Sequence, residues 1–229
     1  MKLYGFALLA VLLLAGCGDT KPPAAPPSMA ASTVPPPEVP VMGREVRILA
    51  LGDSLFAGYG LRPGESYPAK LEAALRAQGI NARIANAGVS GDTSAGGLER
   101  LAFTLGSQPQ PPELVIVSLG GNDMLRGLPP EQTRANLDAI LTEIKRRKVK
   151  VLLMGMLAPP NLGPDYRAKF DAIYPVLARK HGAALVPFFL QAVTGKPDLI
   201  QADHVHPTAG GIEEIVAATA GQVADEIER

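Results

Sequence analysis

The sequence predicts an α/β domain in which one parallel sheet lies between two layers of helices. From Val46 onward, short apolar runs alternate with longer stretches whose apolar residues recur every three or four positions. The first pattern is typical of buried strands and the second of amphipathic helices, and their alternation favours a parallel sheet covered on both faces. The chain after residue 43 is long enough for one well-buried core and short for two. We therefore expect one three-layer α/β/α domain at residues 44–229.

Residues 1–17 have the pattern of an export signal. Lys2 supplies a positive charge, and the apolar stretch at residues 3–14 is too short to span a bilayer. The segment ends in Ala15-Gly16-Cys17, which resembles the lipobox of bacterial lipoproteins, whose cysteine is acylated. Cys17 is the only cysteine of the chain, so it has no partner for an internal disulfide. The alternative is an ordinary signal peptide that is cut nearby and leaves an incidental cysteine.

Lipidation of Cys17 would hold the protein on a membrane surface, because several acyl chains on one residue anchor more firmly than one. We expect an anchored lipoprotein of the bacterial cell envelope that faces the periplasm. Gly18 stands where an aspartate often signals inner-membrane retention, so the resemblance to lipoproteins favours the outer membrane.

Residues 18–43 differ in composition from the rest of the chain. They are rich in Pro and Ala and contain few large apolar residues. Such a segment cannot bury enough apolar surface to fold, and its prolines favour extended backbone. We expect a disordered tether here, rather than a Pro-rich ligand for a partner domain.

Within the domain, five apolar runs are expected to be strands, at residues 46–51, 82–87, 114–119, 149–156 and 184–187. Helices are expected between them, at residues 67–78, 93–105, 131–148 and 165–181. A last helix is expected to start near Pro207, a residue that suits a first helical position, and to run towards Ile227. Five strands in this alternation favour a flavodoxin-like sandwich.

The charge of the chain is balanced, with 22 Lys and Arg residues against 22 Asp and Glu residues. This balance argues against nucleic acid as a partner. The one basic run, at residues 145–150, lies where a helix is expected to end, and a solvated last turn explains it.

Ser54 is a candidate nucleophile. It lies in Gly52-Asp53-Ser54-Leu55, directly after the first expected strand. Ligands bind at the carboxyl ends of strands in open α/β sheets, which is where this serine would stand. A strand-to-helix turn capped by Asp53 or Ser54 explains the same residues without catalysis. The choice depends on whether the chain supplies a base and an oxyanion hole.

Histidine is the usual base for a serine at neutral pH, and the chain has three. His181 lies at the expected end of a helix, where capping explains it. His206 follows Asp203 by three residues, a spacing that can place the carboxylate on Nδ1 and leave Nε2 facing a serine. His206 is therefore the predicted base and Asp203 its orienting acid, with His204 as the alternative base. Metal binding by these three residues is disfavoured, because no third cluster completes a site.

Two loops at strand ends offer donors for an oxyanion. Residues 86–93 form a Gly-rich turn near a helix start, and residues 120–123 combine two glycines with Asn122, whose side chain can donate. Turn formation alone also explains each loop. Neither has the spacing of a phosphate- or dinucleotide-binding fingerprint.

Taken together, four segments resemble the blocks of the SGNH, or GDSL-type, hydrolase family: residues 52–55, 86–91, 120–123 and 203–207. They have the family's order and spacing and cover the chain from residue 48 to the last helix. Within the family, the chain is most similar to exported bacterial enzymes with arylesterase, acyl-CoA thioesterase and lysophospholipase activity. The resemblance implies a sheet with strand order 2-1-3-4-5.

The resemblance also implies a role for each matching residue. Ser54 would be the nucleophile, with Asp203 and His206 as the rest of the triad. The backbone amides of Ser54 and Gly91 and the side chain of Asn122 would form the oxyanion hole. The predicted enzyme uses no metal and no organic cofactor. Asp53 is then assigned to holding the turn and not to catalysis.

The predicted substrate is a small-molecule carboxylic ester or thioester. Four residues are expected to line its acyl groove, although each also suits the core: Met124, Leu125, Met156 and Leu157. The loop at residues 155–163 is too short for a large lid, so we expect an open site. Two alternatives are a carbohydrate or cell-envelope O-acetylesterase and an envelope lipoprotein that binds lipids or glycans without catalysis. The sequence leaves the oligomeric state open.

Overall fold

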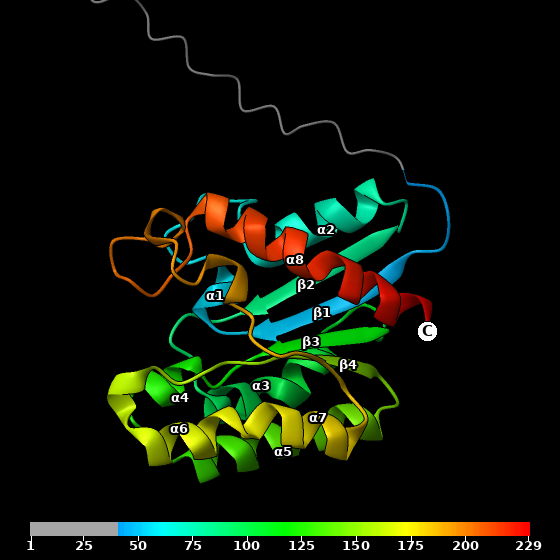
Figure 1. Ribbon diagram of the computed structural model, residues 1–229. Coiled ribbons are helices and arrows are strands. Elements are labelled where there is room, and N and C mark those ends of the chain that lie inside the picture. The colour runs from blue at the N-terminus through cyan, green and yellow to red at the C-terminus, as the bar shows by residue number, and fades with distance from the viewer. Residues whose placement is uncertain (1–40) are drawn as a thin grey trace, which may run out of the picture. The chain divides into compact units, whose positions relative to one another are not determined.

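The computed structural model describes residues 41–229, which form a five-stranded sheet between two layers of helices (Figure 1). The predicted signal peptide, Cys17 and most of the predicted tether lie outside the described residues. The sheet order is β2-β1-β3-β4-β5 and every neighbouring pair is parallel, which confirms the predicted topology. The strands are β1 (Val46–Gly52), β2 (Ala82–Gly88), β3 (Leu114–Ser118), β4 (Lys150–Met154) and β5 (Ala184–Val186).

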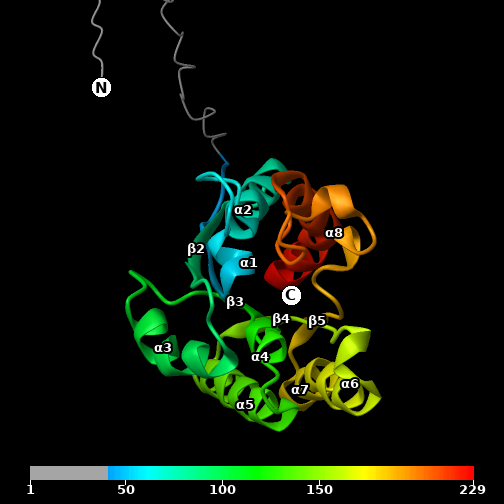
Figure 2. The same ribbon diagram turned by 90° about the vertical axis from the view of Figure 1, so that its left-hand side faces the viewer.

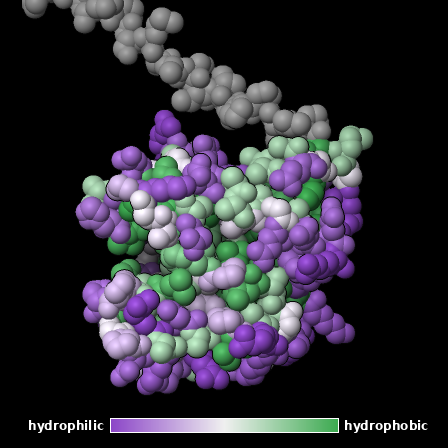
Figure 3. Space-filling model, viewed as in Figure 1, coloured by the Kyte–Doolittle hydropathy of each residue, from purple (hydrophilic) through white to green (hydrophobic). Residues whose placement is uncertain are grey.

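The long helices cover both faces of the sheet (Figure 1). One face is covered by α2 (Tyr67–Ala77) and α8 (Ala209–Glu228), and the other by α3 (Ser94–Gly106), α5 (Pro130–Arg146), α6 (Pro164–Asp171) and α7 (Ile173–His181). On the face seen in Figure 3, hydrophilic residues are frequent over the helices, and apolar residues gather in a band between the two helical layers. No helix within residues 41–229 is long and apolar enough to cross a membrane.

Two helix predictions need correction. The helix expected at residues 165–181 is two helices, α6 and α7, which meet at Ala172. Pro175 explains the break, because its ring removes a backbone donor and clashes with the carbonyl of Asp171 one turn earlier. The last helix begins at Ala209 rather than Pro207, because the Thr208 side chain caps it by accepting from the backbone N–H of Gly211.

The periodicity of the sequence does not show the shortest elements. The helices α1 (Ser54–Ala57) and α4 (Gly121–Leu125) follow the ends of β1 and β3. Three 3₁₀ turns lie in the loops after β4 and β5, at η1 (Pro160–Leu162), η2 (Gln191–Val193) and η3 (Pro197–Leu199). The fourth strand is also shorter than residues 149–156. Elements of three to five residues are too short to display a repeat.

An aromatic cluster fixes α1 on the sheet. The ring of Phe56 stacks on Tyr67 at a centroid distance of 5.3 Å and meets the edge of Phe189 at 5.7 Å. Close approach of α1 requires two glycines, because a Cβ at Gly52 would lie 2.7 Å from the Phe56 ring and one at Gly88 would lie 2.3 Å from a backbone nitrogen of α1. The residue that begins α1, Ser54, is therefore held rigidly above the end of β1.

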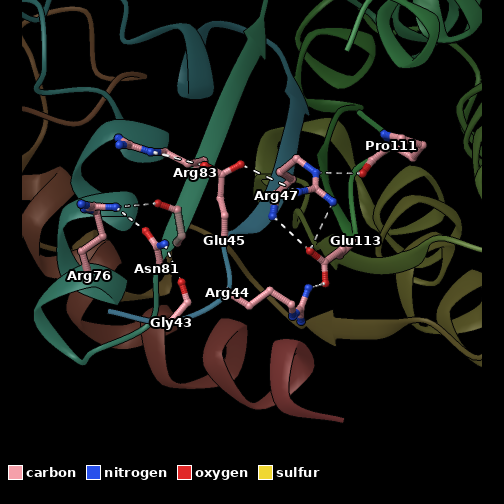
Figure 4. A network of polar contacts seen from close by, with 10 residues as sticks. Gly43, Arg44, Glu45, Arg47, Arg76, Asn81, Arg83, Pro111 and Glu113 are labelled. Atoms are coloured by element: carbon pink, nitrogen blue, oxygen red, sulfur yellow. Dashed lines mark hydrogen bonds and ion pairs between the residues drawn. The ribbon is translucent and has the colours of Figure 1, made fainter. Parts of the chain in front are cut away.

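The chain enters the domain at the amino-terminal end of β1, away from Ser54, and polar contacts fix the start of this strand (Figure 4). The Asn81 side chain donates to the Gly43 carbonyl at 3.1 Å. Arg44 pairs with Glu113, which also accepts from the backbone N–H of Arg47 at 3.4 Å. The first described residues thus lie at one end of β1, and the candidate site lies at the other, carboxyl end.

Another polar contact joins α7 to α5. The His181 imidazole lies 2.6 Å from the Asp138 carboxylate, so it links two helices instead of capping its own helix as predicted.

Candidate active site

The four predicted blocks meet at the carboxyl ends of the strands, the end that Figure 2 faces. Ser54 begins α1, Gly91 lies in the loop after β2, and Asn122 lies in α4 after β3. Asp203 and His206 lie in the loop that leads to α8. Segments far apart in the sequence therefore bring all five predicted residues to one end of the sheet.

A chain of hydrogen bonds joins Asp203, His206 and Ser54. The Asp203 Oδ2 atom lies 2.6 Å from His206 Nδ1, and His206 Nε2 lies 2.8 Å from the Ser54 hydroxyl. The backbone N–H groups of Val205 and His206 donate to the other oxygen of Asp203 at 3.0 Å. Hydrogen bonds from the backbone and side chain of His206 lower the pKa of Asp203 to about 2, so its carboxylate only accepts at neutral pH. In neutral His206, Nδ1 then donates and Nε2 is left to accept the serine proton.

His204, the alternative base, lines the same cavity but does not make the contact with Ser54. Its backbone is left-handed, with φ of 61°, and its N–H donates to the Gln201 carbonyl. Tyr59 packs against the His206 ring at a centroid distance of 4.5 Å and so restricts its orientation. Within residues 41–229, no group of three or more His, Cys, Asp or Glu side chains is arranged to hold a metal ion.

The backbone N–H groups of Ser54 and Gly91 are the predicted donors of the oxyanion hole. The turn at residues 89–92 is closed by a 3.1 Å hydrogen bond from the Asp92 N–H to the Val89 carbonyl, and Gly91 has φ of +85°. This is the pattern of a type II turn, in which the third position needs glycine. In the described part of the chain, no acceptor takes the N–H of Gly91 or that of Ser54. Both residues line the cavity, where these donors remain available.

The Asn122 side chain, the predicted third donor, lines the same cavity. Its Nδ2 donates to the Asp92 carbonyl at 2.9 Å and to Asp53 Oδ2 at 3.3 Å. The turn before it requires Gly120, which has φ of +104° and whose Cβ would lie 2.4 Å from the Tyr174 hydroxyl. The amide is thus held between the loops that follow β1 and β2.

Sequence reasoning missed the arginines that hold these loops. Arg100 of α3 donates to Asp92 at 2.6 Å and to the Gly52 carbonyl at 2.9 Å, so it ties the Gly-rich loop to the end of β1. Arg126 donates to the Gly91 carbonyl at 2.7 Å. The helical spacing of residues 93–105 predicts α3, but it does not indicate which polar side chain reaches back to another strand end.

Asp53 caps α1, which confirms that it holds the turn. Its Oδ1 accepts the backbone N–H of Leu55 at 3.0 Å. The side chain is 2% exposed, and this burial raises the pKa of Asp53 to about 6, against an ordinary value of 3.8. The carboxylate therefore lies in the site as a buried charge above pH 6.

This buried carboxylate predicts a pH-dependent difference in stability between the wild type and Asp53→Asn. The folded protein binds the proton more tightly than the unfolded chain, so the stabilising contribution is present below pH 4 and is lost as the pH rises through 6. Over that range the wild type should lose about 3 kcal/mol of unfolding free energy relative to the variant. Urea unfolding of both proteins at pH 4 and pH 8 measures the difference. An equal change in both proteins would contradict the prediction.

The site opens into a cavity of about 450 Å³. All four predicted groove residues line it: Met124, Leu125, Met156 and Leu157. The two methionines are also buried in the core, whereas Leu125 and Leu157 are 58% and 43% exposed. The cavity therefore has an apolar wall next to the Ser54 hydroxyl.

Known proteins are similar to this chain in sequence and in fold. The family described as "GDSL-like Lipase/Acylhydrolase family" matches residues 50–213. The chain is 67% identical to AlinE4, whose crystal structure is described as that of an SGNH-hydrolase family esterase; the match covers 80% of this chain and 97% of that chain, with a TM-score of 0.70. Esterase TesA of Pseudomonas aeruginosa is 43% identical over 160 residues, which are 70% of this chain and 79% of that protein. Thioesterase 1/protease 1/lysophospholipase L1 of Escherichia coli K12 is 42% identical over 160 residues, 70% of this chain and 74% of that protein.

These matches agree with the four blocks and with the sheet order, and they confirm the resemblance found in the sequence. Residues 50–213 include every block, from the end of β1 to the start of α8. The chain belongs to the GDSL-like lipase/acylhydrolase, or SGNH hydrolase, family.

Proposed function

We propose that this protein hydrolyses carboxylic esters and thioesters through an acyl intermediate on Ser54. The observation that carries the proposal is the hydrogen-bonded chain from Asp203 through His206 to the Ser54 hydroxyl. The relatives named esterase and thioesterase support the same reaction class. No metal or organic cofactor is required for this chemistry.

Each residue has a role in the proposed reaction. The Ser54 oxygen attacks the carbonyl carbon and gives its proton to His206 Nε2, which then protonates the leaving alcohol or thiol. Asp203 stabilises the imidazolium and holds its orientation. The N–H groups of Ser54 and Gly91 and the Asn122 amide donate to the oxyanion. Water then gives a proton to His206 and attacks the acyl carbon, the bond to the Ser54 oxygen breaks, and His206 returns the proton to that oxygen as the acid leaves.

A substrate panel tests the proposed function. Turnover is measured for p-nitrophenyl esters from acetyl to palmitoyl, together with a thioester and a lysophospholipid. The apolar wall predicts that activity extends beyond acetyl esters and includes the thioester. Activity confined to acetyl esters would favour the O-acetylesterase instead. Absence of turnover on every substrate would favour the non-catalytic binding protein.

The groove residues predict a change in chain-length preference. We expect Leu157→Ser to lower kcat/KM for octanoyl esters about fivefold and to leave acetyl esters unchanged, because a long acyl chain loses an apolar contact worth about 1 kcal/mol. Phe103→Ser is the matched control, since Phe103 is 79% exposed on α3 and does not line the cavity. An equal effect of Leu157→Ser on both substrates would argue against this groove.

We also propose that Cys17 carries a lipid anchor and that residues 18–43 tether the domain to a bacterial envelope membrane. The support is the Ala15-Gly16-Cys17 sequence and the lone cysteine. The absence of an aspartate at Gly18 favours the outer membrane, with the domain in the periplasm.

The anchor predicts the behaviour of Cys17→Ser. This variant should be released from the membrane fraction or accumulate as an unprocessed precursor, because acylation requires the thiol. Cell fractionation and the mass of the protein measure both outcomes. A Cys17→Ser protein with the mass of the processed form and membrane association equal to that of the wild type would refute the lipid anchor.

A further inference from the structure

Asp53 is a buried acid that the proposed reaction does not use. Its two oxygens bind two different elements of the site, since Oδ1 accepts from Leu55 of α1 and Oδ2 accepts from Asn122 of α4. Asp53 and Asn122 are 69 positions apart in the sequence. One carboxylate thus connects the turn that carries Ser54 with the side-chain donor.

The Asn122 amide has to face the oxyanion with its NH₂ group. A primary amide can turn over, which would present its oxygen to the oxyanion and repel it. The two partners of Nδ2 are the Asp92 carbonyl and the Asp53 carboxylate, and both are acceptors when Asp53 is ionised. These two acceptors therefore favour the amide orientation in which Asn122 Nδ2, and not the amide oxygen, faces the site.

The two contacts differ in length, at 2.9 Å to Asp92 and 3.3 Å to Asp53. Because the longer hydrogen bond is the weaker one, its N–H is the one that can be shared between Asp53 and a charged oxygen that develops nearby. Asp53 and Asn122 both line the cavity that contains Ser54.

We propose that Asp53 is a positioning residue of the oxyanion hole, which fixes the Asn122 amide towards the reacting carbonyl and couples it to the turn of Ser54. The inference rests on the proposed function. It extends the role of Asp53 beyond capping, which needs only the Oδ1 atom. Burial raises the pKa of Asp53, while His206 lowers it and Asp92 raises it; at pH 8 the carboxylate is ionised and acts as the acceptor that the proposal requires.

A double-mutant cycle at pH 8 tests the proposal, with Asp53→Asn, Asn122→Ala and the double variant. Loss of one oxyanion donor typically lowers kcat by about 10²–10³, and we expect Asp53→Asn to lower it by about 10- to 100-fold with KM within about twofold. In the Asn122→Ala background, Asp53→Asn should change kcat by less than about threefold, because the group through which it acts is gone. Affinity for a phenylboronic acid, whose adduct on Ser54 places a charged oxygen in the hole, should fall by the same factor as kcat.

Two variants separate positioning from structure. Asp53→Ser can still cap α1 but is too short to reach Asn122, so it should lose activity as Asp53→Asn does. Asp123→Asn is the matched control, because Asp123 is equally buried and accepts from Ser94 and Thr133 instead of the Asn122 amide. It should lower the melting temperature, and its effect on kcat should be additive with that of Asn122→Ala.

Additive effects of Asp53→Asn and Asn122→Ala would overturn the proposal, as would an Asp53→Asn variant with wild-type kcat. If neither Asp53 variant folds, a crystal structure of the wild-type boronic acid adduct decides: Asn122 Nδ2 should contact the boronate oxygen with Asp53 still beside it, and an amide turned the other way would overturn the proposal. Ser54→Ala separates the two levels of inference. If that variant stays active, the proposed function fails; if it is inactive and the cycle is additive, only the role of Asp53 fails.

Discussion

Ser54→Ala is expected to lower kcat for p-nitrophenyl butyrate by on the order of 10⁴–10⁶. The substitution removes the oxygen that would form the acyl intermediate, and within residues 41–229 no other hydroxyl takes the 2.8 Å contact with His206. The assay is initial-rate turnover at pH 8 with purified protein. Any residual hydrolysis would come from water bound near the oxyanion donors.

The fold should survive this substitution. Ser54 is 9% exposed and its side chain contacts His206 at the cavity wall, whereas the packing of α1 depends on Phe56. The melting temperature should stay within about 3 °C of the wild type, which corresponds to less than about 1 kcal/mol. Unchanged turnover by a folded Ser54→Ala protein would remove Ser54 from the mechanism.

His206→Ala is expected to cause a loss of similar size, on the order of 10⁴–10⁶ in kcat, because the serine then has no base. Asp203→Ala should cost less, about 10²–10⁴, since the imidazole would still contact Ser54 and Tyr59 would still pack against the ring. A double variant of Ser54 and His206 should be no slower than either single variant. His204→Ala serves as the control and should retain most activity. A loss of kcat as large as that of His206→Ala would indicate that His204 takes part as the base.

The layers of the fold could be predicted because most strands are apolar runs and each long helix has a clear period, whereas the strand order came from the resemblance to the SGNH family. The strand after Lys150 and the helix at residues 130–146 illustrate both patterns. The break between α6 and α7 was also visible in the sequence as Pro175, although the apolar spacing continued across it. A helix start at α1 was one interpretation of residues 52–55, whereas α4 could not be predicted, because the close approach allowed by Gly120 determines it.

The candidate site was predictable to the extent that its chemistry is local in the sequence. Asp203 and His206 are three residues apart, and the contact between them follows from that spacing. The contacts that hold the donors in place join distant segments, as Arg100 does with Gly52 and Asp53 does with Asn122. No periodicity or local spacing encodes such contacts, so the sequence assigned Asp53 only to its own turn.

The central claim is that Ser54 is an activated nucleophile, and covalent labelling of the wild-type protein tests it most directly. The protein is treated with a fluorophosphonate, digested and examined by mass spectrometry. We expect one phosphonyl group per chain, attached to Ser54, and no labelling of His206→Ala under the same conditions. An unlabelled wild-type protein, or a label on another residue, would contradict the account.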